Sequence, residues 1–369
     1  MGNFGLIDVA ELDYSLVWPR ELFEWEARRI LTSKGNASAK IEALFGEAFA
    51  DVDVAAVVAP APRGYGAAPP SDAEDRALLQ SLISNESPVR PYKRAQYWLE
   101  RQKDSEPRIQ RKRFSEAFLE LIDEMQDLGY FPKALPRGCV DDRGSWGFDL
   151  SAEISKAIKC NIVWPDDLKQ ESLSFPDDVL YSVIEYFHDQ AQRPRTRSLH
   201  ETFGCGYHYE NFSKASGGVV YRWRVNELLD SYDVGLRLGN QGDETGKLIQ
   251  HAALNLDELG DQAIAVDAFD RDRTVADAIQ LYRKRAATTT DRRAAIAQLA
   301  NYLELRRSEL KKVQFSSGDE SALFQIFNKF MIRHGDSAQR GDYGDEYLDW
   351  IFWTSVSAIQ LVRARTQVS

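Results

Sequence analysis

The sequence predicts a mainly α-helical protein, and three observations support this fold class. Apolar residues recur at three- and four-residue spacings through most of the chain, which is the period of one helix face. Only one pair of segments alternates as strands do, and a turn of Gly, Asn and Asp residues joins it. With 43% apolar and 28% charged residues, the chain can build cores. We expect a helical N-terminal region, one small β-hairpin and a C-terminal four-helix bundle.

Shifts in composition divide the 369 residues into five segments. Residues 1–52 are predicted to be an N-terminal helical segment, and residues 53–72, rich in Ala, Pro and Gly, a flexible linker or loop. Residues 73–175 are a helical region with a basic patch, and residues 176–262 an intermediate helical region that includes the hairpin. Residues 263–369 are the four-helix bundle.

Each element has its own signal in the sequence. The expected helices lie within residues 19–50 and 73–130, at 150–159, from 176 onward, and at 218–231, 274–284, 291–312, 321–334 and 345–365. The hairpin joins residues 232–238 to 246–250. The last helix is apolar on nearly every side, so it is either the buried helix of the bundle or packs against a second copy of the chain. A homodimer through the C-terminal bundle is the expected assembly.

The balance of charge limits the partners. With 46 Lys plus Arg against 57 Asp plus Glu, the net charge is −11, so any contact with RNA must be local. Three scattered cysteines are too few for a disulfide framework, which fits a reducing interior and a cytoplasmic protein. No apolar stretch approaches the roughly 20 residues of a membrane helix, so we expect no membrane association.

One basic stretch is suited to a local contact with RNA. Between residues 90 and 113, Lys and Arg alternate with Tyr92, Tyr97 and Trp98, so phosphates could bind the cations while bases stack on the rings. The candidate RNA-binding residues are Arg90, Lys93, Arg94, Arg101, Arg108, Arg111, Lys112 and Arg113. The same pattern also fits a solvated helix face with acidic neighbours, which is the commoner arrangement.

A group of metal-ligand residue types lies near the middle of the chain. Cys205, His208 and His200 fall within nine residues, and zinc accepts both ligand types. A clear fourth ligand is missing, because Cys160 and His188 are remote and have no special spacing. We therefore predict no metal and no cofactor, and we expect an aromatic loop that packs on the core.

The segment with the most chemical content is near the C-terminus, where Asn328, Lys329, Arg333 and His334 lie within seven residues at a predicted helix end. RNA cleavage without metal needs an imidazole to move a proton on or off the 2′-hydroxyl or the leaving oxygen, and cations to hold the phosphate. The alternative is structural: Arg333 and His334 precede Gly335, and cations and a left-handed glycine stabilise a helix end without any chemistry.

The last hundred residues, with FDRDRTVADAIQLYRKR, SALFQIFNKFMIRHGD and YLDWIFWTSVSAIQLV, resemble the C-terminal HEPN-type helical domain of AbiJ-like abortive-infection proteins of bacterial defence. The stretch from YHYENF to SYDVGLRL is similar to the segment before that domain. The resemblance implies a dimerising four-helix bundle, in many members with an Arg-x(4–6)-His ribonuclease motif at the dimer cleft. His334 matches the motif histidine, and Asn328 the polar residue that often follows the arginine. Phe327, Asn328 and Lys329 occupy the three arginine positions, and Lys329 keeps only the charge.

The sequence therefore predicts a bacterial anti-phage protein whose C-terminal HEPN-like domain cleaves RNA without metal at a dimer cleft. The expected catalytic residues are His334, Arg333, Lys329 and Asn328. The alternative is a non-catalytic dimerisation, sensor or scaffold protein of a defence system, acting with a separate partner protein.

Overall fold

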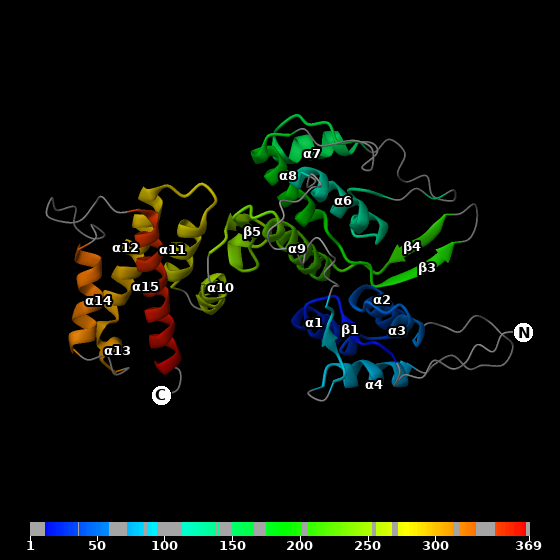
Figure 1. Ribbon diagram of the computed structural model, residues 1–369, viewed down its shortest axis with the longest axis horizontal. Coiled ribbons are helices and arrows are strands. Elements are labelled where there is room, and N and C mark those ends of the chain that lie inside the picture. The colour runs from blue at the N-terminus through cyan, green and yellow to red at the C-terminus, as the bar shows by residue number, and fades with distance from the viewer. Residues whose placement is uncertain are drawn as a thin grey trace, which may run out of the picture. The chain divides into compact units, whose positions relative to one another are not determined.

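The computed structural model describes residues 12–35, 37–58, 72–84, 87–93, 113–136, 139, 149–165, 175–200, 205–252, 256–267, 272–312, 317–329 and 344–366. Helices dominate these residues and the strands are short, so the predicted mainly α fold class is confirmed (Figure 1). Packing divides the chain into two units, Met1–Trp223 and Arg224–Ser369. None of the described helices is both long enough and apolar enough to cross a bilayer.

The first unit combines helices with two pairs of strands. Its helices are α1 (Arg20–Leu31), α2 (Ser38–Ala48), α3 (Asp53–Ala56), α4 (Asp72–Leu82), α6 (Phe114–Asp127), α7 (Leu150–Ile158), α8 (Asp177–Gln190) and the first part of α9 (Lys214–Ser231). Strand β1 (Ser15–Leu16) pairs in parallel with β2 (Arg90–Pro91), and β3 (Thr196–His200) pairs antiparallel with β4 (Gly206–Glu210). Helix α9 begins at Lys214, four residues before the predicted start.

Aromatic side chains fill the interior of the first unit. Phe187 of α8 is fully buried, and its ring centroid lies 5.1 Å from that of Phe131 and 4.9 Å from that of Trp164. Phe23 of α1 and Phe45 of α2 both meet Phe49 edge to face. Such tilted pairs add to the stabilisation that burial itself provides.

A buried ionic cluster links distant parts of the first unit. Arg193 is fully buried, and its Nη1 and Nη2 lie 3.3 Å from Glu26 Oε1 and 2.8 Å from Glu47 Oε1. The Ser216 hydroxyl donates to Glu26 Oε2 at 2.6 Å, and the Tyr130 hydroxyl donates to Glu47 Oε2 at the same distance. Every charge in this cluster therefore has an opposite charge or a hydrogen bond, as burial requires.

The β3–β4 hairpin was not predicted from the sequence, which indicated an aromatic loop packed on the core. Its strands lack alternating apolar residues: TRSLH and GYHYE mix polar and aromatic side chains, and much of both strands is exposed. The hairpin is attached to α6 where the Tyr209 hydroxyl donates to the Asp127 carbonyl at 2.7 Å. Beside it, Gly129 has φ +78, and a Cβ there would lie 2.5 Å from the Tyr209 ring, so only glycine fits.

The second unit contains the predicted hairpin and the helical bundle. The hairpin is β5 (Leu236–Leu238) and β6 (Leu248–Gln250), joined through a 3-10 turn at Gly242–Glu244, and its position is confirmed. The helices after it are α10 (Leu256–Asp267), α11 (Thr274–Arg283), α12 (Thr289–Leu305), α13 (Arg307–Lys312), α14 (Ser317–Lys329) and α15 (Asp345–Thr366). Helix α10 adds to the four helices predicted, and the predicted helix 291–312 is divided between α12 and α13.

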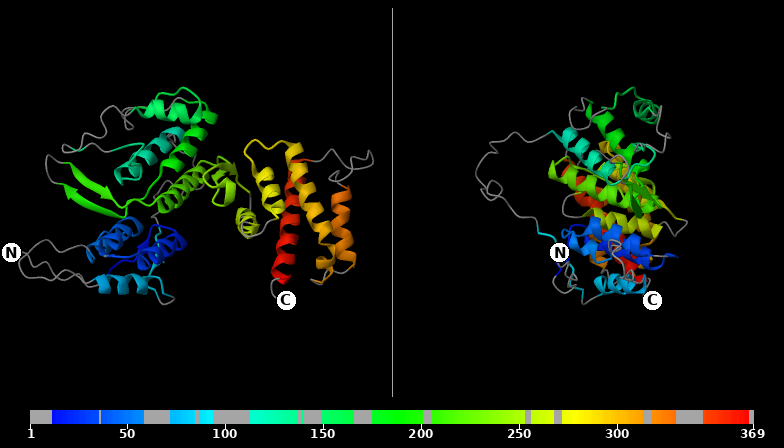
Figure 2. Two further views of the ribbon diagram at one scale, coloured as in Figure 1. Left: turned by 180° about the vertical axis from the view of Figure 1, so that it is seen from behind. Right: turned by 90° about the vertical axis from the view of Figure 1, so that its right-hand side faces the viewer.

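Helix α15 supplies much of the bundle core, as its nearly continuous apolar sequence predicts. Leu348, Ile351, Phe352 and Val356 are fully buried, and α15 packs on α10 and α12. The rings of Phe352 and Tyr282 stack 3.7 Å apart. Figure 2 shows α15, in red, lying lengthwise beside the yellow and orange helices. The sequence predicted either that this helix is the buried helix of the bundle or that it packs against a second copy. The first explanation is confirmed for the face of α15 that carries these residues.

Helix α12 has a specified beginning and end. At its start the Thr288 hydroxyl accepts from the Asp291 N–H at 3.1 Å, and Asp291 Oδ2 accepts from the Thr288 N–H at 2.9 Å, which is a capping box. At its end Arg306 leaves the helix, and its guanidinium lies 3.7 Å above the Tyr302 ring and 3.1 Å from Asp272 Oδ2. Arg306 is thus held by Asp272 at the point where α12 ends and before α13 begins.

Candidate functional site

Of the four predicted catalytic residues, the structure describes Asn328 and Lys329. Asn328 is exposed near the end of α14, and Lys329 is the last residue of that helix. Arg333 and His334 lie outside the described residues. Along the chain, Asn328 and Lys329 are therefore the last two residues of α14, and Arg333 and His334 fall between α14 and α15 in the sequence.

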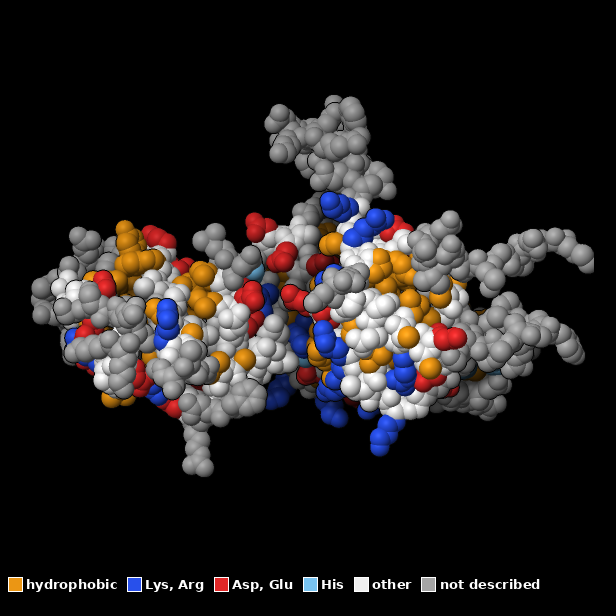
Figure 3. Space-filling view, turned by 90° about the horizontal axis from the view of Figure 1, so that it is seen from below, with side chains coloured by type: hydrophobic (Ala, Val, Ile, Leu, Met, Phe, Trp, Pro, Cys, Tyr) orange, Lys and Arg blue, Asp and Glu red, His pale blue; other side chains and the backbone are white. Residues whose placement is uncertain are grey.

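The predicted basic patch is described only at its edges. Arg94, Arg101, Arg108, Arg111 and Lys112 lie outside the described residues. Arg90 contacts Asp13 Oδ1 at 3.0 Å and donates to the Ser15 hydroxyl at 3.2 Å, so an acidic neighbour balances its charge. Lys93 and Arg113 are exposed. Acidic and basic side chains are interspersed on the face drawn in Figure 3.

A cavity of about 980 Å³ opens on the second unit. It is bounded by the ends of β6 and α11, by the beginnings of β5, α10 and α12, and by the first half of α15 as far as Ser357. The side chains that give it chemical character are His251, Tyr282, Arg283, Arg292, Asp349, Trp350 and Trp353. Arg292 Nη1 lies 3.5 Å from Asp345 Oδ2, and Asp345 begins α15, so the cavity is at the end of the bundle where α15 starts.

His251 in this cavity is oriented by a buried carboxylate. Its Nδ1 lies 2.7 Å from Asp257 Oδ2, and the imidazole remains 40% exposed while the Asp257 side chain is 4% exposed. Asp257 also accepts from the Ala252 N–H at 3.0 Å and lies 3.5 Å from Arg237 Nη1. With Nδ1–H directed at the carboxylate, Nε2 is the nitrogen left to accept or donate a proton at the cavity.

The guanidinium of Arg292 and the phenol ring of Tyr282 lie together in the cavity wall. Arg292 Nη2 donates to Gln250 Oε1 at 2.6 Å, and its Nε–H is buried without a hydrogen-bond partner among the described residues. The Tyr282 hydroxyl donates to Asp349 Oδ1 at 2.6 Å. Burial and this carboxylate raise the pKa of Tyr282, so it stays a neutral donor. Trp350 is 49% exposed and offers an aromatic face to a ligand.

Buried charges lie behind the cavity. Arg283 is 2% exposed and donates to Asp261 Oδ1 at 3.0 Å, and its Nη2 lies 3.5 Å from Glu244 Oε2. Burial raises the pKa of Glu244 to about 7, although the Arg283 charge opposes the shift. Glu244 therefore changes its charge near neutral pH.

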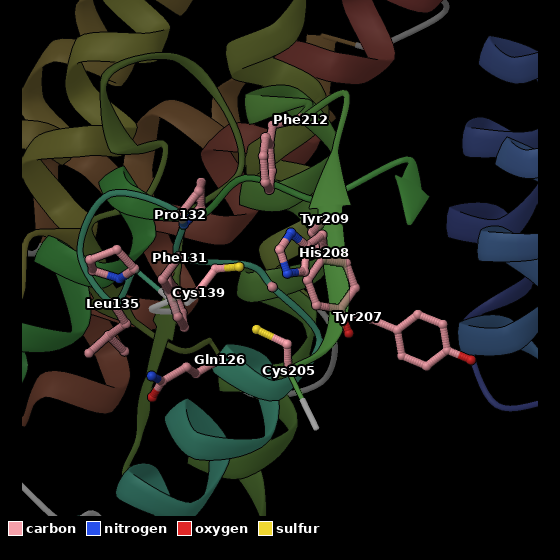
Figure 4. Close-up of a pocket in the computed structure, with 12 residues that line it drawn as sticks. Gln126, Phe131, Pro132, Leu135, Cys139, Cys205, Tyr207, His208, Tyr209 and Phe212 are labelled. Atoms are coloured by element: carbon pink, nitrogen blue, oxygen red, sulfur yellow. The ribbon is translucent and has the colours of Figure 1, made fainter. Parts of the chain in front are cut away.

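Four metal-ligand side chains meet in the first unit. Cys139, His200, Cys205 and His208 each offer one ligand atom, and the four atoms all lie within 4.8 Å of one another. Figure 4 shows both thiols and the His208 ring turned toward the same space, beside a cavity of about 260 Å³. Three of these residues are close together in the sequence, whereas Cys139 precedes His200 by 61 residues. Sequence spacing could not identify that fourth ligand, and Cys160 and His188 are absent from the group.

Comparison with known proteins does not assign an activity to the cavity or to the group of Cys and His side chains. Comparison of the chain with family models, with curated proteins and with solved structures found no match.

Proposed function

We propose that the protein is a bacterial anti-phage protein whose C-terminal unit cleaves RNA without a metal ion. The observation that best supports this function is the cavity at the end of the bundle, where the Asp257-oriented imidazole of His251 faces the same space as Arg292 and Trp350. The resemblance of the last hundred residues to HEPN-type domains gives independent support. In many HEPN domains the cleft between two copies is the active site, so the proposal includes a homodimer.

The proposed chemistry uses proton transfer and charge stabilisation. His251 Nε2 takes the proton of a ribose 2′-hydroxyl, and the 2′-oxygen attacks the adjacent phosphorus. The bond from phosphorus to the 5′-oxygen breaks, that oxygen takes a proton from a general acid, and the products are a 2′,3′-cyclic phosphate and a 5′-hydroxyl end. The sequence nominates His334 for this acid, and its position lies outside the described residues. Arg292 balances the charge that develops on the phosphate, and Trp350 stacks on a neighbouring base. No step requires a metal ion.

The test is incubation of the purified protein with RNA, without added divalent metal, and analysis of the product ends. We expect cleavage with cyclic phosphate ends, and a loss of at least about 100-fold in rate for His251→Ala and for His334→Ala, since general acid and base residues contribute about 10²–10⁴-fold. Arg292→Ala should lose a similar factor because it removes a charge-stabilising donor.

Arg273→Ala is the matched control for Arg292. Arg273 lies at the opposite end of α11 from the cavity, is 50% exposed and pairs with Asp243 at 2.9 Å, so its loss should leave the rate unchanged. RNA that stays intact with folded wild-type protein, under conditions where expression is toxic to cells, would contradict the proposal and favour a non-catalytic assembly role. Equal cleavage rates for wild type and His251→Ala would show that His251 is not the general base and that the cavity is not the cleavage site.

A further inference from the structure

We infer that Cys139, His200, Cys205 and His208 form a structural zinc site that joins the β3–β4 hairpin to the chain segment after α6. The inference is independent of the proposed function, because the site lies in the first unit and its test measures metal content. It reverses the prediction from the sequence, in which a fourth ligand was missing.

The distances are those that a tetrahedral zinc site needs. With Zn–S of about 2.3 Å and Zn–N of about 2.0 Å, tetrahedral geometry places ligand atoms about 3.3–3.8 Å apart. Cys139 Sγ and His200 Nδ1 are 3.6 Å apart, and no pair among the four ligand atoms exceeds 4.8 Å. A contraction of the four ligand atoms toward a common centre would bring them to the distances of a zinc site.

The donor set selects the metal. Two thiolates and two imidazoles are soft to intermediate ligands, which bind zinc in preference to magnesium or calcium. Four protein ligands fill a tetrahedral zinc ion and leave no position for water or substrate. The site is therefore structural rather than catalytic.

Local structure presents three of the ligands together. In the antiparallel pair, His200 is opposite Gly206 and Ser198 is opposite His208, so the two histidines are on the same face of the hairpin. Their ring centroids are 4.9 Å apart. Cys205 immediately precedes β4, and Gly206, the first residue of that strand, has φ +82, a left-handed conformation that suits glycine.

The hairpin lacks the apolar contacts that normally hold two strands together. None of the residues of the two strands is buried, Leu199 is 56% and Tyr207 40% exposed, and no third described strand pairs with them. Isolated two-stranded hairpins are marginally stable in water. Zinc at the His200 end would fix this hairpin because it cross-links both strands to Cys139, and metal binding adds directly to the free energy of folding.

The first experiment measures zinc in the purified, reduced full-length protein by mass spectrometry of the metal. We expect one zinc ion per chain. Replacement of zinc by Co²⁺ should give the visible absorption of tetrahedral cobalt with thiolate ligands, a readout that needs no variant. A zinc content near zero after zinc addition to reduced protein, or an octahedral cobalt spectrum, would overturn the inference.

Variants identify the ligands. Cys139→Ser and His208→Ala should each weaken zinc binding by more than the roughly 10- to 100-fold that loss of an outer-shell partner costs. Cys160→Ser and His251→Ala are the matched controls, because each removes the same type of residue outside the cluster, and both should keep one zinc ion.

Disulfide formation is the alternative to zinc binding for the two thiols, since Cys139 and Cys205 are both free cysteines. Thiol counting on protein purified without reductant distinguishes the two outcomes: zinc keeps both thiols countable after denaturation in chelator, whereas a disulfide removes them. A Cys139–Cys205 disulfide in protein that binds no zinc after reduction would contradict the site.

Discussion

At the scale of single residues, the Glu244 carboxyl changes its charge near neutral pH. It is buried beside Arg283, with Arg237, Asp257 and Asp261 as further charged neighbours, and its pKa is raised to about 7. Since the unfolded value is lower, the folded protein holds this proton more tightly. Its contribution to stability is therefore present at low pH and is lost as pH rises through about 7.

The first prediction concerns this group. Between about pH 4.5 and 7 the ionisation of Glu244 should lower the free energy of unfolding by ~3 kcal/mol, at 1.36 kcal/mol per pKa unit. Glu244→Gln should reduce this slope in urea unfolding followed at several pH values. Asp243→Asn, at an adjacent and exposed position, should keep the wild-type slope. An unchanged slope in Glu244→Gln would show that other groups determine it.

The second prediction concerns Arg193. Arg193→Met leaves Glu26 and Glu47 buried with one positive charge fewer, and loss of one partner from a buried ion pair costs about 3–5 kcal/mol. Arg197→Met removes a partly exposed pair with Glu42 and should cost about 1 kcal/mol or less. Chemical denaturation of both variants measures the difference, and equal losses would contradict the assignment.

Individual residues divide into those the sequence could identify and those it could not. Cys205, His208 and His200 are neighbours in the chain, so their residue types drew attention to zinc, but without a fourth ligand the sequence predicted no metal. Cys139 joins them only through the fold, as His251 joins Arg292 across the cavity. Contacts across many residues leave no periodic signal in one sequence.

At the scale of elements, the start of α12 gives a clean test of local structure. The Thr288 side chain accepts the Asp291 N–H, so Thr288→Ala should cost about 1 kcal/mol. Thr290→Ala, which changes an exposed residue inside the first turn, should change stability little. Thermal unfolding of the two variants gives the comparison. A larger loss for Thr290→Ala would contradict the capping assignment.

The two antiparallel hairpins differ in how visible they are in the sequence. Strands β5 and β6 have apolar residues at Leu238, Leu248 and Ile249 that are buried, and their turn is rich in Gly, Asn and Asp. Strands β3 and β4 have no such buried series, so a search for apolar alternation misses them. Helices were predicted more completely, because each buries one apolar face with a period of 3.6 residues.

At the scale of the whole molecule, the proposed homodimer makes a prediction about mass. Light scattering should give twice the 41.9 kDa of one chain. The outer face of α15 exposes Leu361 at 42%, so Leu361→Asp should shift the protein toward monomer. Val163→Asp, at an 80% exposed position of the first unit, is the control and should leave the mass unchanged. A monomeric wild type at micromolar concentration would contradict the dimer.

Fold class was predictable for the whole chain, and the assignment of most helices followed from spacing and end signals. Helix α10 was missed, although Ala263 and Ile264 are buried, because acidic residues interrupt its apolar face. The break at Arg306 was missed because its ion pair with Asp272, which lies 34 residues away in the sequence, forms only in the folded bundle.

The zinc site that we infer depends on Gly129, a residue that leaves room for the Tyr209 ring and supplies no ligand. A methyl group at residue 129 would lie 2.5 Å from the Tyr209 ring and would push this ring away from the end of α6. Because Tyr209 is part of β4, the β3–β4 hairpin would shift with it and carry His200 and His208 away from the Cys139 thiol. Gly129→Ala should therefore weaken the zinc binding that we infer, although residue 129 supplies no ligand atom, and zinc content of the purified variant measures the loss.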